Sequence, residues 1–382
     1  MSDDAPEPDR IEGALHPRAT PRLIGHDAVE AAFLEAHAAG RLHHAWLISG
    51  PRGVGKATRA WRNARFQRAR PPEEVGGLFD TAPLPPPQDL DVPADHPVAR
   101  RLLALSEPGL HLVRRGGAGA TDREREKNAA DGRFSQVIGV DRVRALGRFI
   151  HMSAVDGGRR VVIVDAADEM NSAAANALLK MLEEPPARTT LLLISHQPAR
   201  LLPTIRSRCR ELRMGPLAAP EMAEALAQAG IDPGSFPEAL AELARGSVGE
   251  AVRLLTLDGL ILYAEIVAIL ASLPRLDRMR AVKLAEQVSG RAGEARLDLL
   301  LHLVEVALSR LARTGVCGHA PGGEAARGES AMLIRLSPSA AKGRAWADCA
   351  QEIGARMRHG VAVNLDPAAL VLDMVFRIAQ TA

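Results

Sequence analysis

The sequence predicts an α/β domain with a doubly wound parallel sheet, followed by an all-α region. Three observations carry this prediction. Leucine-rich and β-branched apolar runs alternate with helical patterns, a glycine-rich loop separates a short apolar run from a helix, and strand-like runs stop after Met214. Apolar strands that alternate with helices are typical of sheets with both faces covered. The chain has 382 residues, enough for two or three domains.

The α/β domain is expected over residues 23–214, after a disordered N-terminus of residues 1–22. Apolar residues at helical spacing and a glycine stop predict a helix within 23–40. Residues 44–49 form an apolar run that predicts a strand, and a helix is expected to begin near Lys56 after the glycine-rich loop. The later elements are expected in this order: strand 109–115, helix 136–155, strand 159–170, helix 171–186 and strand 189–196.

Two stretches interrupt the α/β pattern. Residues 70–97 are rich in proline and acidic residues and predict an irregular insertion. Residues 116–133 are polar and predict a mobile loop. Helical patterns then predict a small helical domain over 215–259 and a larger one over 260–382, which a glycine-rich stretch at 314–330 interrupts.

Composition excludes several classes of protein. The hydrophobic fraction of 47% and the charged fraction of 25% are typical of soluble globular proteins, and no apolar run is long enough for a bilayer. A net charge of +2 and 3% aromatic residues argue against a surface whose main role is to grip DNA. The acidic start does not resemble a secretory signal. Cys209, Cys317 and Cys349 are too far apart for a disulfide framework or a cysteine zinc site, so we expect a cytoplasmic protein.

The stretch GPRGVGKAT at 50–58 is close to a phosphate-binding loop. Gly50, Gly55 and Lys56 occupy the positions of the pattern G-x-x-x-x-G-K-[ST], with Gly53 between them. Backbone N–H groups of such a loop surround phosphates, and the lysine reaches the outer ones. The Ser or Thr that would bind magnesium is replaced by Ala57, and Thr58 lies one position too far along. A simple glycine turn before a helix is the alternative, which the strand–loop–helix context disfavours.

A second motif, VVIVDAAD, ends in acids. Asp165 closes a buried strand, as does the aspartate that holds the metal ion through water in many ATPases. Ala166 stands where those enzymes place a glutamate base, and Asp168 and Glu169 lie beyond that position. A core strand with a solvated acidic end is the alternative, but the phosphate loop at this separation favours the nucleotide interpretation.

The stretch TIRSRCREL at 204–212 places Arg206 and Arg208 around a serine. Arginine stabilises charge on a transferring phosphoryl group, often across a subunit boundary. From the residues alone an ordinary basic surface is favoured. The histidines at 43, 44 and 196 and Cys209 lack metal-ligand spacing, and Glu183 and Glu184 are expected to close a helix.

Taken together, SAAANALLKMLEEPP, LLPTIRSRCREL and HAWLISGPRGVGKAT resemble the clamp-loader subunits of the AAA+ family, most closely the delta-prime type of bacterial DNA polymerase III. The pairing of a helix that ends in LEEPP with a serine–arginine–cysteine turn is specific to clamp loaders. The resemblance covers residues 23–212, extends less strongly over the following helices, and is weak over the C-terminal third.

The resemblance implies an AAA+ parallel-sheet domain, a helical lid at 215–259 and a helical collar at 260–382. It implies that Arg208, in a turn with Ser207 and Cys209, reaches the ATP of a neighbouring subunit as an arginine finger. It also implies a hetero-pentamer with other clamp-loader subunits, a sliding clamp as a partner, and primer–template DNA contacted through the complex, with no membrane partner.

The chain departs from the active members of this family in three places. Ala57 replaces the magnesium ligand, Ala166 replaces the base, and Gly249 in GSVGEA replaces the arginine that senses the γ-phosphate. The four-cysteine zinc module of many relatives is also missing, so we expect no zinc or other metal. The expected function is a non-hydrolysing stator with no required cofactor. Its degenerate site would bind ATP or ADP weakly at most and consists of Gly50, Gly53, Gly55, Lys56, Thr58 and Asp165.

Three alternatives remain open from the sequence. An active ATPase of the gamma/tau motor type would show turnover by the isolated chain. A P-loop kinase would need a substrate pocket and a lid with catalytic arginines, and the sequence shows no such set. A DNA-binding module without nucleotide chemistry would show tight, salt-dependent DNA binding.

Overall fold

The computed structural model describes residues 6–11, 13–70, 87–151, 158–232, 237–288, 293–363 and 365–382. These residues form two compact units. The sheet unit comprises residues 1–229 with 247–249, and the helical unit comprises 230–246 with 250–382. The predicted lid at 215–259 is therefore divided between the two units. Most of the predicted insert at 70–97, residues 71–86, lies outside the described residues.

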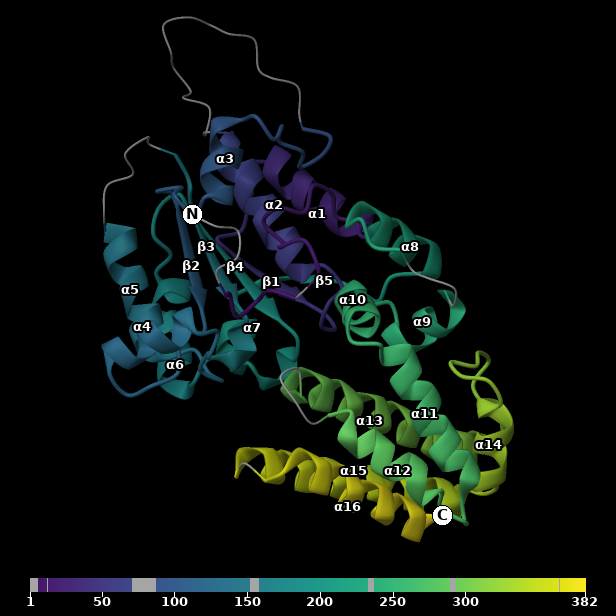
Figure 1. Cartoon of the computed structure of the whole chain (residues 1–382). Helices are drawn as coiled ribbons and strands as arrows, with labels where there is room; N and C mark the ends of the chain where they lie inside the picture. The colour runs from purple at the N-terminus through teal and green to yellow at the C-terminus, as the bar shows by residue number, and fades with distance from the viewer. Residues whose placement is uncertain are drawn as a thin grey trace, which may run out of the picture. The chain divides into compact units, whose positions relative to one another are not determined.

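The sheet unit is built on five parallel strands in the order β2-β3-β4-β1-β5 (Figure 1). Ser49 at the end of β1 pairs in register with Ser195 of β4 and Arg213 of β5, and Arg114 of β2 pairs with Asp165 of β3. These residues mark the carboxyl edge of the sheet, where open α/β sheets bind their ligands. The strands are β1 (Ala45–Ser49), β2 (Leu110–Arg114), β3 (Arg160–Asp165), β4 (Thr189–Ser195) and β5 (Arg210–Arg213).

The period-2 alternation of strand side chains divides the core between the two faces of the sheet. Val161 and Ile163 pack on one face with α1 and α2, whereas Val162 and Val164 pack on the other face with α5, α6 and α7. Both faces are therefore covered, as the continuous apolar strands predict. The helices of this unit are α1 (Asp27–Ala38), α2 (Lys56–Ala69), α3 (Pro97–Leu103), α4 (Asp122–Ala130), α5 (Val140–His151), α6 (Ser172–Glu183), α7 (Pro203–Arg206) and α8 (Ala219–Gln228), with the 3-10 turns η1 (Ala167–Glu169) and η2 (Pro198–Arg200).

The helical unit packs long helices around a buried polar centre. Glu329 is fully buried, accepts a hydrogen bond from the Tyr263 hydroxyl at 2.5 Å, and lies 2.8 Å from the Arg310 guanidinium. Arg310 also contacts Glu242 at 3.1 Å, which joins α9 to α13. The helices are α9 (Pro237–Ala244), α10 (Val248–Thr256, whose first two residues belong to the sheet unit), α11 (Gly259–Ser272), α12 (Arg278–Glu286), α13 (Gly293–Cys317), α14 (Glu329–Leu336), α15 (Ala340–Ala362) and α16 (Pro367–Thr381).

The predicted fold class, α/β followed by all-α, is confirmed, two local expectations are corrected, and one strand was not predicted. The stretch 116–133 is not a loop throughout, because α4 forms within it. Its N-cap Thr121 accepts from the backbone of Glu124, and the Glu124 carboxylate accepts from the backbone of Thr121, so both ends of a capping box are present. The N-terminus is not disordered over residues 6–11 and 13–22, which make defined contacts with α2 and β2. The polar run RELR forms an edge strand, β5, through pairing with β1.

Candidate functional site

The glycine-rich loop connects β1 to α2 at the carboxyl edge of the sheet. Gly50, Gly53 and Gly55 have φ values of +147°, +74° and +97°, which side-chain-bearing residues rarely adopt. A Cβ on Gly50 would lie 2.1 Å from the carbonyl oxygen of Met214. The loop therefore has the strand–loop–helix geometry expected from the sequence, and its glycines are needed for that backbone path.

Lys56 binds the loop itself. Its Nζ donates to the carbonyl oxygen of Gly50 at 2.7 Å and to that of Pro51. The side chain is 3% exposed, and burial lowers its pKa to about 8, although the charges of Asp165 and Asp168 oppose this change. The group that should meet the outer phosphates is thus engaged with backbone oxygens.

The position after this lysine offers no metal ligand. Ala57 packs against the apolar core of the first face, and Thr58 is 8% exposed. Ala57 has no oxygen with which to bind magnesium, as the Ser or Thr at this position of an intact loop does. The structure places Gly50, Gly53, Gly55 and Lys56 in one loop between β1 and α2.

Asp165 lies at the end of β3, beside Arg114 in the strand register. Burial, together with the negative charges of Asp9 and Glu169, raises its pKa to about 7, although the positive charges of Lys56 and Arg114 oppose this change. Ala166, at the position expected for a base, is buried and apolar. The site therefore retains the acid of the second motif but not the base.

The two acids beyond this position serve other contacts. Asp168 accepts hydrogen bonds from the backbone N–H groups of His196 and Gln197 at 3.0 and 3.2 Å. Glu169 pairs with Arg52 and Arg115, each at 3.0 Å. Asp168 therefore fixes the connection after β4, and Glu169 joins Arg52 of the loop to Arg115, which directly follows β2.

Residues 247–249, which belong to the sheet unit, pack directly on the phosphate loop. The N–H of Gly249 donates to the carbonyl oxygen of Gly53 at 3.2 Å. A Cβ on Gly249 would lie 3.1 Å from Gly53 Cα, and a Cβ on Gly53 would lie 2.1 Å from Ser247 Oγ. Glycine at both positions allows this backbone approach, so an arginine at position 249 does not fit the arrangement.

Arg208 lies elsewhere, in the turn between α7 and β5. Its two terminal nitrogens contact the Glu183 carboxylate at 3.0 Å and the Thr204 carbonyl oxygen at 3.0 Å. Ser207 Oγ donates to the same carbonyl oxygen at 3.2 Å, and the half-buried Cys209 packs on the second face, where burial raises its pKa to about 12. The Arg208 side chain is 36% exposed. Contacts within the sheet unit therefore hold this turn in place, while the guanidinium of Arg208 remains partly exposed to solvent.

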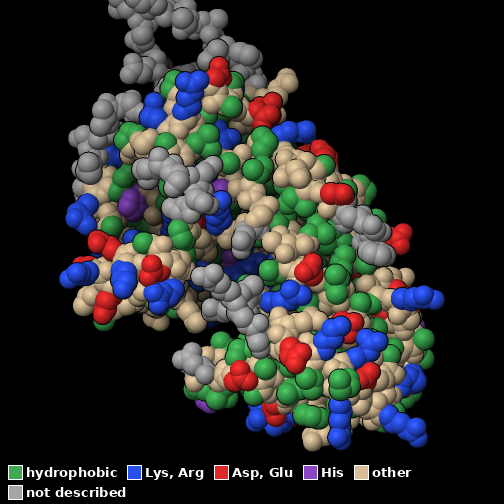
Figure 2. All heavy atoms as spheres, viewed as in Figure 1, with side chains coloured by type: hydrophobic (Ala, Val, Ile, Leu, Met, Phe, Trp, Pro, Cys, Tyr) green, Lys and Arg blue, Asp and Glu red, His purple; other side chains and the backbone are tan. Residues whose placement is uncertain are grey.

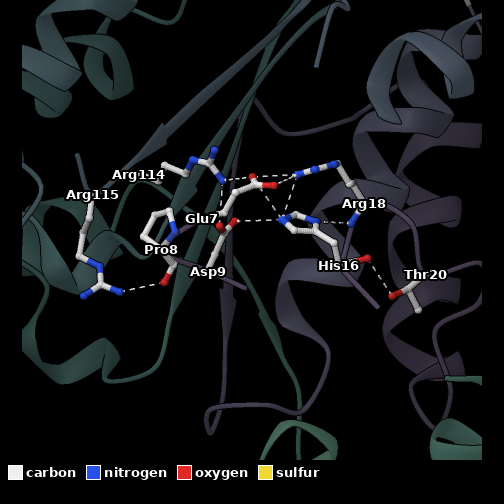
Figure 3. A network of polar contacts seen from close by, with 8 residues as sticks. All are labelled: Glu7, Pro8, Asp9, His16, Arg18, Thr20, Arg114 and Arg115. Atoms are coloured by element: carbon white, nitrogen blue, oxygen red, sulfur yellow. Dashed lines mark hydrogen bonds and ion pairs between the residues drawn. The ribbon is translucent and has the colours of Figure 1, made fainter. Parts of the chain in front are cut away.

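Sequence reasoning missed a polar network made by the N-terminal segment (Figure 3). The Arg114 guanidinium contacts Glu7 at 2.5 Å and Asp9 at 2.8 Å, and Arg18 contacts Glu7 at 2.7 Å. His16 Nε2 lies 3.5 Å from Glu7 and 3.8 Å from Asp9. No local pattern in the sequence predicts the contacts of Arg114, because they join residues more than 100 positions apart.

Among the described residues, Glu7, Asp9 and His16 form a group with ligand atoms within 4.8 Å of one another. A cation there would share the carboxylates with the guanidiniums of Arg18 and Arg114, which already neutralise them. The network is therefore better described as an internal ion-pair cluster than as a metal site.

Across the residues that the structure describes, no single helix is long and apolar enough to cross a bilayer. The pair α10 and α11, bent by 80° at its break, meets the criteria of length and composition only when the two helices are taken together.

Comparison with known proteins places the resemblance on the same region. A family model described as DNA polymerase III, delta subunit, matches residues 94–218. The chain is 37% identical over 212 residues to the DNA polymerase III subunit delta' of Pseudomonas aeruginosa, covering 55% of each chain. It is 28% identical over 260 residues to the subunit delta' of Bacillus subtilis, covering 67% of this chain and 62% of that one. The chain thus spans little more than half the length of these curated relatives.

Two further similar proteins are named as gamma/tau or gamma subunit-related proteins of DNA polymerase III. The gamma/tau subunit of Mycobacterium bovis is 29% identical over 194 residues, which cover 50% of this chain and 28% of that one. A solved gamma subunit-related protein of Thermotoga maritima is 19% identical with a TM-score of 0.41, covering 91% of this chain and 99% of that one. By these matches, the chain is similar to the delta' subunits of DNA polymerase III over part of its length.

Proposed function

We propose that this chain is a non-hydrolysing stator subunit of the DNA polymerase III clamp loader and supplies Arg208 to the ATP site of a neighbouring subunit. In this role it assembles with other clamp-loader subunits in a hetero-pentamer in the cytoplasm. The complex opens the sliding clamp and places it on primed DNA. The stator requires no cofactor of its own and binds no zinc.

The engagement of Lys56 with the loop's own carbonyl oxygens carries this proposal. Phosphoryl transfer depends on positioned positive charge and on metal-bound phosphates. Here the lysine is turned inward, Ala57 cannot bind magnesium, and Ala166 cannot activate water. Each of these changes acts on hydrolysis within the chain, so their coincidence supports loss of turnover.

The arrangement of Arg208 supports the action in trans. Contacts to Glu183 and Thr204 hold the guanidinium in one direction while it stays partly exposed, as a finger directed at another subunit requires. In the family resemblance this turn faces the nucleotide of the neighbouring subunit. The chain thereby combines a disabled site in cis with an intact group for a site in trans.

The charge distribution supports a role in which this chain is not the main DNA-binding subunit of the complex. On the face drawn in Figure 2, basic and acidic side chains are interspersed rather than gathered into one basic surface. With a net charge of +2, the chain lacks the electrostatic footprint of a main DNA-binding subunit. We therefore place DNA contact in the complex as a whole.

The test is the ATP turnover of the reconstituted complex with Arg208→Ala. A finger contributes about 10³-fold or more at its site, so turnover should fall by the share that this site supplies, with assembly unchanged. Arg206→Ala is the matched control, because Arg206 is exposed and lies two positions away. Unchanged turnover with Arg208→Ala, or an equal loss with Arg206→Ala, would overturn the finger assignment.

An active ATPase of the gamma/tau type is the second candidate, and the similarity to the Mycobacterium bovis gamma/tau subunit favours it. It requires that another oxygen replaces the missing magnesium ligand. Turnover by the isolated chain distinguishes it from the stator.

A further inference from the structure

The N-terminal segment, defined here as residues 7–11 and 13–23, reaches the carboxyl edge of the sheet, where open α/β sheets bind their ligands. Its carboxylates Glu7 and Asp9 contact Arg114, which stands beside Asp165 in the strand register. The negative charge of Asp9 also acts on Asp165 directly and helps to raise its pKa. The beginning of the segment therefore lies at the end of the strand that carries the acid of the degenerate site.

The same segment touches the phosphate loop and the residues that close on it. Ile11 Cδ1 lies 2.7 Å from the position of a Cβ on Gly249, whose N–H is bonded to Gly53. Further along, Leu23 Cδ1 lies 2.7 Å from the position of a Cβ on Gly55. The segment thus meets the region of the loop at two separate points, on residues that would surround the phosphates of a nucleotide.

Two arginines of α2 and the arginine that directly follows β2 hold the segment in place. Arg62 donates to the carbonyl oxygen of Pro21 at 2.7 Å, and Arg65 donates to that of Arg18 at 2.6 Å. Arg115 donates to the carbonyl oxygen of Pro8 at 2.9 Å. The path is therefore fixed by backbone contacts along its length.

The ring of His16 adds a contact to α2. It lies edge-on to the Trp61 ring, with centroids 6.2 Å apart. Because Trp61 is 1% exposed, the segment covers part of this helix from solvent.

The charges of the segment suit a place normally filled by an anion. Burial would raise the pKa of both Glu7 and Asp9. For Glu7, hydrogen bonds from Arg114 and Arg18 outweigh this effect. For Asp9, the hydrogen bond from His16 and the charge of Arg114 outweigh it, so the pKa of each carboxyl lies below its usual value. The segment therefore brings two carboxylates, both ionised at neutral pH, to the basic groups at this edge.

We infer that residues 7–11 and 13–23 act as a tethered plug of the degenerate nucleotide site, with the carboxylates of Glu7 and Asp9 held by Arg114 at the carboxyl edge of the sheet and Ile11 and Leu23 against the residues of the loop region. In this proposal, the segment blocks access of ATP and ADP to a loop that retains its glycines and its lysine. It deepens the proposed function, because a stator whose site is filled by its own chain does not respond to nucleotide. Its test uses the isolated full-length chain, so its failure is separate from a failure of the Arg208 assignment.

The experiment compares wild type with Glu7→Lys/Asp9→Lys, which turns both ion pairs with Arg114 into repulsions. The charge-matched control is Asp122→Lys/Glu126→Lys on the exposed surface of α4. Hydrogen exchange measured by mass spectrometry reports residues 6–22 and 50–58 separately, and fluorescent ADP reports binding. Both segments should lose protection in the plug variant only, and the affinity for ADP should rise by about tenfold or more, since the open fraction of sites sets the apparent Kd.

A second variant tests the proposal even if the two lysine substitutions release the N-terminal segment only in part. A protease site placed at Thr20–Pro21 allows the folded full-length chain to be cut and the N-terminal peptide to be removed. Exchange at residues 50–58 should then increase, ADP should bind, and addition of the free peptide should reverse both effects. Unchanged exchange at 50–58 after removal of the peptide would overturn the plug, as would increased exchange without ADP binding. Tight ADP binding by the uncut wild-type chain would also overturn it.

Discussion

Arg208 is directed by one carboxylate and one carbonyl oxygen. The pair with Glu183 joins the end of α6 to the turn before β5, and both side chains are partly exposed. An exposed ion pair contributes little to stability, typically below about 1 kcal/mol. In the proposed function, the contribution of this pair would be to orient Arg208, since a displaced catalytic group loses much of its effect.

Glu183→Ala should lower the ATP turnover of the reconstituted complex by about 2- to 10-fold, less than Arg208→Ala, because the finger is present but less well oriented. Glu184→Ala is the matched control, being the next residue and also exposed. Thermal unfolding of the isolated chain should be unchanged for both variants. An equal response to the two alanine variants would show that Glu183 does not position Arg208.

Asp165 and Lys56 make the degenerate site sensitive to pH. The pKa of Asp165 is raised to about 7, chiefly by burial, so the folded chain binds more protons than the unfolded chain between about pH 4 and pH 7. Stability contributed by this group is therefore present at low pH and is lost as pH rises through that window, with a limiting slope of about 1.4 kcal/mol per pH unit. Lys56 acts at higher pH: burial lowers its pKa to about 8, so stability rises again above that value.

Asp165→Asn removes the first of these titrations. We expect the free energy of unfolding of the variant, relative to wild type, to increase as pH rises from 5 to 7. Urea unfolding followed by tryptophan fluorescence measures this in a Trp346→Phe background, in which Trp46 and Trp61 report the sheet unit. Parallel pH profiles for the two proteins would contradict the raised pKa of Asp165.

Among the elements, α2 is unusual because its polar side chains are buried. Arg59, Asn63 and Gln67 are at most 1% exposed, although the sequence of this helix is rich in charge. Arg59 pairs with Glu30 of α1 at 3.0 Å, and Arg68 pairs with Glu107 at 2.8 Å. The helix is therefore enclosed by polar contacts on one side and by the apolar core of the sheet on the other.

Glu107→Ala should destabilise the sheet unit by about 3 kcal/mol or more, because it removes a buried carboxylate that Arg68 and Arg101 contact. Glu126→Ala on the exposed surface of α4 should change stability by less than about 0.5 kcal/mol. Urea midpoints in the Trp346→Phe background measure both. A loss below about 1 kcal/mol for Glu107→Ala would mean that the pair does not support α2.

The elements that the sequence predicted correctly have strong local patterns. Strands β1, β3 and β4 are continuous apolar runs, and α6 has helical apolar spacing with a polar N-cap at Asn171. The glycine loop was found because its backbone needs glycine at fixed positions. These signals are local, so a single sequence contains them.

The missed elements depend on distant partners or on a weak pattern. Strand β5 is a short charged run that forms by pairing with β1, and Arg210 lies over the Trp46 ring at 5.0 Å. For α4 the signal was present, since Thr121 and Glu124 have capping-box spacing, but the polar composition favoured a loop. The path of residues 7–11 and 13–23 rests on contacts such as Glu7 with Arg114, which no local pattern reveals.

At the scale of the whole molecule, the chain consists of the sheet unit and the helical unit. The sheet unit keeps the architecture of a phosphate-binding domain but fills its loop with its own lysine and covers it with its own N-terminal segment. The helical unit has its own apolar core and its own buried polar centre at Glu329. In the proposed role, the chain would contribute one arginine to a neighbouring subunit and would not need turnover of its own.

The most direct test of the account is steady-state ATP hydrolysis by the purified chain with magnesium present, in parallel with Lys56→Ala. We predict no turnover above background for wild type and no difference in the variant, because the magnesium ligand and the base are both missing. Turnover by wild type that disappears in Lys56→Ala would contradict the stator and identify the chain as an active motor subunit.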